Sequence, residues 1–167
     1  QHMTILTTQR LLLRPMRADD VDAFHAMMRD PETMRFWSTP PHADRSVTKE
    51  WVMTGLGRLP VTDFVIELDG IVVGKAGAWR LPEVGFMIDR RYWRQGIATE
   101  AMSAVIPYLF ANFDCDRLTA DVDPRNTASL AALQNLGFAE THRAENTFFI
   151  NGEWCHSIYL ALPRPAP

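Results

Sequence analysis

The sequence has little that would support a metal site, a disulfide or a nucleotide fold. Its two cysteines, Cys115 and Cys155, lie far apart without metal-ligand spacing, so we expect unpaired thiols. The five histidines form no H-E-x-x-H or similar pattern, and no metal is expected. The nucleotide fingerprints G-x-x-x-x-G-K-S/T and G-x-G-x-x-G are also absent.

Charge and hydropathy exclude further classes. No apolar run approaches the roughly 20 residues that span a bilayer, and the N-terminus has no secretory core, so we expect a cytoplasmic protein without a membrane partner. A net charge of −3 and a pI near 5.9 argue against a nucleic-acid partner. Basic residues are dispersed except at Arg90, Arg91 and Arg94. An acidic protein with one basic pocket suits a small anionic ligand.

Length and composition predict one globular domain. The chain has 167 residues, of which 47% are hydrophobic, enough for a sizeable core. We expect the domain to cover residues 3–162. Gln1 and His2 before Met3 are typical of a tag remnant, and residues 163–167 form a proline-containing tail that we expect to be loose.

Apolar periodicity and turn residues predict alternating helices and strands. Asp69-Gly70 and Asn151-Gly152 are hairpin signals, and Pro107 should kink or break the helix that contains it. The second helix should turn Val47, Trp51, Val52 and Met53 inward. The predicted strands are 6–16, 64–68, 71–79, 83–88, 118–122, 138–150 and 154–162. The first predicted helix is capped at 18–20 and stops before Pro31, and the second covers 46–56. The third continues to about Phe113, and the fourth starts at Asn126 or Thr127 and ends at Gly137.

The segment from Arg91 to Ala101 carries the most information about function. It joins the strand over 83–88 to the start of a helix, where unpaired N–H groups and the positive end of the helix dipole favour an anion. Gly96 allows close backbone approach and Ala98 keeps the next position small. Arg91 and Arg94 add guanidinium groups beside the turn. These features indicate a phosphate site.

This segment resembles the x-x-G-x-G/A loop of the GNAT superfamily of N-acetyltransferases. Tyr92-Trp93 and Ala98-Thr99-Glu100-Ala101 are similar to the Rim-type branch, which acetylates ribosomal-protein N-termini. Two departures are Arg94-Gln95 in place of Gly-Lys, and Trp93 where Gln or Arg is common. The resemblance implies that the pyrophosphate of acetyl-CoA binds here. The implied binding residues are Arg91, Arg94, Gln95, Gly96, Ile97, Ala98 and Thr99.

The order of elements is also similar to the GNAT order, from about Thr7 to Leu162. The resemblance implies an α/β (α+β) fold: a mixed, mostly antiparallel twisted sheet of about seven strands, with helices on both faces. It implies that the sheet splays after the strand over 83–88. Pantetheine could bind there like an added strand, paired with the backbone of Phe86, Met87 and Ile88.

A second motif, Asn126-Thr127-Ala128-Ser129 followed by Leu136-Gly137-Phe138, resembles the family's N-x-x-S…LGF segment. The resemblance implies that Asn126 binds the pantetheine arm and that Ser129 protonates the leaving thiolate. The alternative is that Asn126 is only a helix N-cap and Ser129 an exposed serine in the first turn.

Acetyl transfer needs a base for the amine, and two carboxylates are candidates. Glu83 resembles the base of histone-type members, although it lies one residue closer to the phosphate loop, which could turn it to the wrong face. Glu145 lies where Rim-type enzymes present an acidic residue. Either carboxylate could instead be a solvated strand-end charge, and Tyr159 is an alternative acid or a packing residue.

The acceptor is the least determined partner. Residues 31–44 and 140–156 should frame its cleft, and Phe36, Trp37, Trp79, Phe148 and Trp154 either line it or belong to the core. We expect an acetyl-CoA-dependent enzyme that acetylates a primary amine, either a peptide N-terminus or a small molecule. The alternative is a non-catalytic acyl-CoA sensor of the same fold. The resemblance also implies a possible homodimer.

Overall fold

The computed structural model describes residues 4–167, so the expected tag remnant, Gln1 and His2, lies outside the described residues. The strands are β1 (Leu6–Thr7), β2 (Leu11–Arg14), β3 (Asp63–Leu68), β4 (Ile71–Arg80), β5 (Glu83–Ile88), β6 (Arg117–Val122), β7 (Ala139–Ile150) and β8 (Glu153–Pro163). The helices are α1 (Val21–Met28), α2 (Arg45–Gly55), α3 (Ile97–Asn112) and α4 (Thr127–Asn135), with short 3-10 turns η1 (Ala18–Asp20) and η2 (Arg90–Tyr92).

The strands form a single mixed sheet. Within residues 4–167 it has eight strands in the order β1-β2-β3-β4-β5-β6-β8-β7, and only β5 and β6 run parallel. The predicted α/β class and mostly antiparallel sheet are confirmed. The expected first strand over 6–16 is wrong in one respect. The Thr8 N–H donates to the Leu11 carbonyl at 3.0 Å, and this turn splits the segment into two antiparallel strands.

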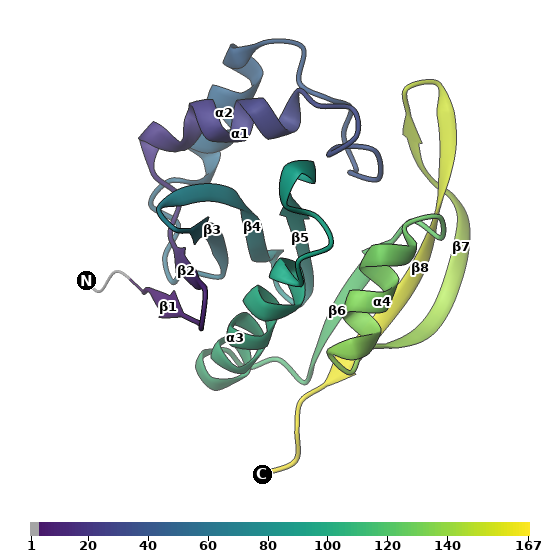
Figure 1. Cartoon of the computed structure of the whole chain (residues 1–167). Helices are drawn as coiled ribbons and strands as arrows, with labels where there is room; N and C mark the ends of the chain where they lie inside the picture. Colours follow the sequence, from purple (N-terminus) through teal and green to yellow (C-terminus); the bar gives the residue numbers. More distant parts are fainter. Residues whose placement is uncertain (1–3) are drawn as a thin grey trace.

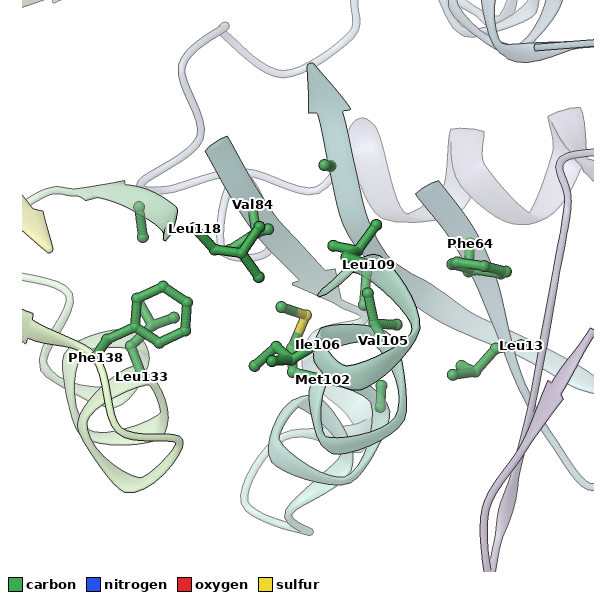
Figure 2. Packing of buried hydrophobic residues seen from close by; sticks show 14 of the residues in the cluster. Leu13, Phe64, Val84, Met102, Val105, Ile106, Leu109, Leu118, Leu133 and Phe138 are labelled. Atoms are coloured by element: carbon green, nitrogen blue, oxygen red, sulfur yellow. The ribbon is translucent and has the colours of Figure 1, made fainter. Parts of the chain in front are cut away.

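Helices cover both faces of the sheet (Figure 1). Alternate residues of each strand point to opposite faces. On one face α3 and α4 bury the larger core, in which Phe64, Val84 and Leu118 meet Met102 and Leu109 (Figure 2). On the other face α1 and α2 enclose a second cluster that includes buried residues of α1, β3 and β5, namely Phe24, Met27, Val65 and Met87.

Two helices differ in detail from expectation. In α2 Thr48 and Val52 are buried and Trp51 packs against the second cluster, whereas Val47 and Met53 are 40% exposed. Burial of the Thr48 hydroxyl is tolerated because it hydrogen-bonds the ring nitrogens of His25 and His42, at 3.0 and 2.7 Å. The helix α3 continues through Pro107 to Asn112, so the expected break is not found.

The C-terminal segment is held at its start. The Arg164 guanidinium donates to the carbonyls of Phe110, Phe113 and Cys115 at 2.7, 2.5 and 2.7 Å. These carbonyls lie at and beyond the end of α3, where a helix leaves acceptors unpaired. The expected loose tail over 163–167 is therefore wrong for Pro163, which ends β8, and for Arg164.

No helix in the described part of the chain is long and apolar enough to cross a membrane.

Candidate active site

The phosphate loop has the backbone geometry of an anion site. The Asp89 carboxylate accepts the Arg91 N–H at 3.0 Å and starts η2, after which Arg94 and Gly96 have positive φ values of 63° and 73°. Gly96 is the N-cap of α3 and provides no side-chain cap. Within residues 4–167 the N–H groups of Ile97, Ala98 and Thr99 have no protein acceptor. A helix start with three free donors favours a phosphate.

The charge of this loop is distributed differently from expectation. Asp89 holds the Arg91 guanidinium at 2.7 Å, and Asp30 holds that of Arg90 at 2.6 Å. Burial acts against the charged Asp89 carboxyl, but hydrogen bonds from Arg91 lower its pKa overall. Arg91 is therefore neutralised by its neighbour. Arg94 has no ion pair among residues 4–167.

The sheet opens beside this loop. The strands β5 and β6 are paired only at Glu83 and Thr119, whereas β5 is paired with β4 from Gly85 to Ile88. One edge of β5 is therefore left without a strand over the stretch that contains Phe86, Met87 and Ile88. The Ile88 carbonyl accepts the Trp93 indole N–H at 2.8 Å. The predicted splay after this strand is confirmed.

Two carboxylates share one face of the sheet at the opening. Val84 and Phe86 belong to the core beneath α3, so Glu83 points to the opposite face. Ala120 and Val122 belong to the same core, which places Asp121 on the face of Glu83. This pattern removes the concern that Glu83 faces the α3 core.

Both carboxyl groups have raised pKa values. Glu83 stays accessible to solvent, yet partial burial raises its pKa, and the negative charge of Asp121 raises it further. Burial also raises the pKa of Asp121, although the hydroxyl of Ser157 favours its charged form. Asp121 was missed at the sequence level. The alternation of apolar Leu118, Ala120 and Val122 around it could have placed it on the Glu83 face.

Asn126 and Ser129 lie at the start of α4, directly after β6. The Asn126 side-chain oxygen accepts the Ser129 N–H at 3.2 Å, which makes Asn126 the N-cap of this helix. The amide nitrogen of Asn126 and the hydroxyl of Ser129 make no protein hydrogen bond within the described residues. Capping is therefore compatible with ligand binding by the same residues.

Glu145 lies apart from this network. It is exposed, in the part of β7 where the register with β8 shifts and Asn146 has a φ of 55°. The Asn146 N–H donates to the His156 ring at 2.9 Å. No polar contact joins Glu145 to Glu83 or Asp121 in the described part of the chain.

The aromatic residues have mixed environments. Trp37 packs on the second cluster and, with Trp51, faces the ammonium of Lys75, which pairs with Asp63 at 2.7 Å. Trp79 lies beneath Arg58, and Phe36 lies 5.5 Å from the Arg125 guanidinium. Phe148 is half-buried, and Trp154, 55% exposed, contacts Phe149 near the hairpin turn.

Known proteins identify the family. The family described as Acetyltransferase (GNAT) domain matches residues 10–139, which is most of the chain. The protein therefore belongs to the GNAT acetyltransferase family and is an N-acetyltransferase. The resemblance found in the loop is confirmed.

Individual relatives agree with this assignment. Uncharacterized N-acetyltransferase p20 of Bacillus licheniformis is 28% identical over 147 residues, covering 81% of this chain and 83% of p20. Spermidine N(1)-acetyltransferase of Escherichia coli strain K12 is 25% identical over 159 residues, covering 90% and 84%. RimL, a ribosomal L7/L12 alpha-N-protein acetyltransferase solved with coenzyme A, shares the fold with a TM-score of 0.84 at 18% identity, covering 96% of this chain and 98% of RimL.

Proposed function

We propose that the protein transfers an acetyl group from acetyl-CoA directly to a primary amine that carries a further positive charge, on a small molecule or at a peptide N-terminus. One observation carries the proposal: Glu83 and Asp121 lie on the same sheet face, where β5 and β6 separate. The phosphate loop follows β5 directly, so one opening serves both donor and acceptor.

In this proposal acetyl-CoA is held by backbone groups. The N–H groups of Ile97, Ala98 and Thr99 bind the pyrophosphate, with Arg94, Gln95 and Gly96 beside them. Pantetheine pairs with the free edge of β5 at Phe86, because the Met87 carbonyl faces Gly74 of β4. The Ile88 carbonyl is excluded from this pairing as long as Trp93 occupies it. Asn126 donates its free amide nitrogen to the pantetheine arm.

The chemistry requires one base and one acid. Glu83 accepts a proton from the bound ammonium, and the neutral amine nitrogen attacks the acetyl carbonyl carbon. A backbone N–H at the free edge of β5 stabilises the oxyanion. The carbon–sulfur bond then breaks, Ser129 protonates the leaving thiolate, and the Ser129 oxygen recovers a proton from the newly acetylated nitrogen. The raised pKa of Glu83 suits this role, because an effective base titrates near the working pH.

The neighbouring carboxylates of Glu83 and Asp121 indicate the class of acceptor. Two neighbouring carboxylates attract more positive charge than one ammonium supplies. The surface at Gly85, two residues after Glu83 on the same face of β5, is open, since a Cβ built there would meet no atom within 4 Å. A diamine, a polyamine or a peptide N-terminus next to a basic residue therefore fits these two carboxylates better than a monoamine.

A pH profile tests the base. Glu83→Gln should lower kcat/KM by about 100-fold or more at neutral pH. Asp121→Asn removes the neighbouring charge, so the pKa of Glu83 falls and the acid limb of the profile moves to lower pH. Glu145→Gln is the matched comparison and should leave the profile unchanged. Loss of the acid limb in Glu145→Gln, with Glu83→Gln unaffected, would assign the base to Glu145.

An acceptor screen tests the reaction itself. Thiol release from acetyl-CoA would be measured with diamines, matched monoamines, and peptides with basic or neutral second residues. Ser129→Ala should slow turnover on the best acceptor and leave CoA affinity unchanged. Full turnover in Ser129→Ala would remove the acid role. Tight CoA binding without thiol release for any amine would favour a sensor.

A further inference from the structure

The turn between β1 and β2 lies against the phosphate loop, about ninety residues away in sequence. We infer that this turn, Thr8 to Arg10, is a clamp that positions the loop for the pyrophosphate. The inference rests on the proposed function, in which the loop binds acetyl-CoA. Arg10 is then a positioning residue that acts through the loop.

The clamp consists of four hydrogen bonds. Three converge on the Glu100 carboxylate: from the Thr8 hydroxyl at 2.5 Å, the Arg10 backbone N–H at 2.9 Å and the Arg10 Nε at 2.7 Å. The fourth runs from Arg10 Nη2 to the Gln95 carbonyl at 2.8 Å. Arg10 thus holds both sides of Gly96, the N-cap residue of α3.

These contacts solve two problems for an anion site. Arg94 and Gly96 have left-handed backbones, and a loop of this kind keeps its donors aligned only if its neighbours restrain it. Arg10 donates to the Gln95 carbonyl, so this carbonyl oxygen faces Arg10. Glu100 also places a negative charge in the first turn of α3, where it would repel a phosphate. Arg10 neutralises that charge, and the Thr8 hydroxyl adds a hydrogen bond to the same carboxylate.

The bonding pattern favours a clamp over a direct phosphate ligand. The Nε and Nη2 of Arg10 are both engaged by the protein, and its side chain is 39% exposed. Burial acts against the charged Glu100 carboxyl, but the bonds from Thr8 and Arg10 lower its pKa overall. Glu100 therefore stays charged and paired at neutral pH.

Two acetyl donors distinguish loss of the clamp from general damage to the enzyme. Acetyl-CoA carries the pyrophosphate, and S-acetylpantetheine lacks it. Arg10→Ala should lower kcat/KM for acetyl-CoA by about tenfold, the lower end for lost charged hydrogen bonds, and leave the value for S-acetylpantetheine unchanged. Glu100→Ala should act in the same direction. The double variant should be no worse than Arg10→Ala, because both changes release one clamp.

Two further variants sharpen the result. Arg10→Lys should recover less than half of the loss, since an ammonium cannot hold Glu100 and Gln95 with a planar fork. As a control, Arg117→Ala removes an exposed guanidinium at the start of β6, where it pairs with Asp116 at 3.9 Å, and should leave kcat/KM for both acetyl donors unchanged.

The outcomes distinguish the clamp from the proposed function. A wild-type enzyme that uses both donors equally well would show that the loop does not bind pyrophosphate. A wild-type preference for acetyl-CoA that persists in Arg10→Ala would overturn the clamp alone. Equal losses on both donors, additive losses in the double variant, or tighter CoA binding in Glu100→Ala would also overturn it.

Discussion

The phosphate site can be tested electrostatically at Gly96, the exposed N-cap of α3. We expect Gly96→Glu to bind CoA at least about tenfold more weakly than Gly96→Gln at low salt. The two side chains have nearly the same shape and differ by one charge. Both meet the same backbone strain, since φ is 73° at this position. The comparison therefore isolates the charge of the site.

The magnitude follows from the loop geometry. A left-handed backbone costs an ordinary residue about 1–2 kcal/mol, and both variants share this cost. A carboxylate about 4 Å from a phosphate adds repulsion of about 1 kcal/mol in water and about 4 kcal/mol near a protein surface. We take the lower part of this range because a Cβ at Gly96 would lie 3.8 Å from Arg10 Nη2, which would partly neutralise the new charge. A difference of about 1.4 kcal/mol is tenfold in Kd.

Titration calorimetry with CoA measures this difference, and thermal unfolding without ligand provides the control. The two variants should unfold within about 2 °C of each other, both below wild type. The Kd ratio should shrink between about 0.05 and 0.5 M salt, because screening shortens the range of the repulsion. Equal Kd values at low salt would refute an anion site at this helix start.

Two predictions concern stability. Arg164→Ala should lower the free energy of unfolding by about 1–3 kcal/mol, because three carbonyls near the end of α3 lose their donor. The control Arg117→Ala, whose ion pair spans 3.9 Å, should change it by less than about 0.5 kcal/mol. Equal denaturation midpoints for the two variants would contradict this prediction. The pKa of Glu100 is lower in the folded protein, so its charged carboxylate stabilises the fold above the unfolded pKa, and this stabilisation is lost as pH falls through the folded pKa. The difference in Tm between wild type and Glu100→Gln should therefore narrow from about pH 6 to pH 3. A difference that grows in acid would contradict the sign of this linkage.

Local signals in the sequence predicted most of the elements. Asp69-Gly70 and Asn151-Gly152 adopt the positive φ values that hairpin turns require, and both hairpins form. The first strand was wrong because Thr8 to Arg10 lacks a glycine or proline that would announce a turn. Val47 and Met53 were placed inward because helical spacing cannot show that Thr48 has buried hydrogen-bond partners.

The sequence by itself determined the family and predicted a phosphate site at the loop, because that prediction depends on short-range backbone chemistry around Gly96. Tertiary structure alone decided the charges around it. Arg90 is paired with Asp30, which follows α1, and Arg10 arrives from a distant turn to hold Glu100. The pairing of β5 with β6 likewise brings Asp121 beside Glu83. Contacts between distant strands depend on sheet order and register, and one linear pattern is compatible with several of these.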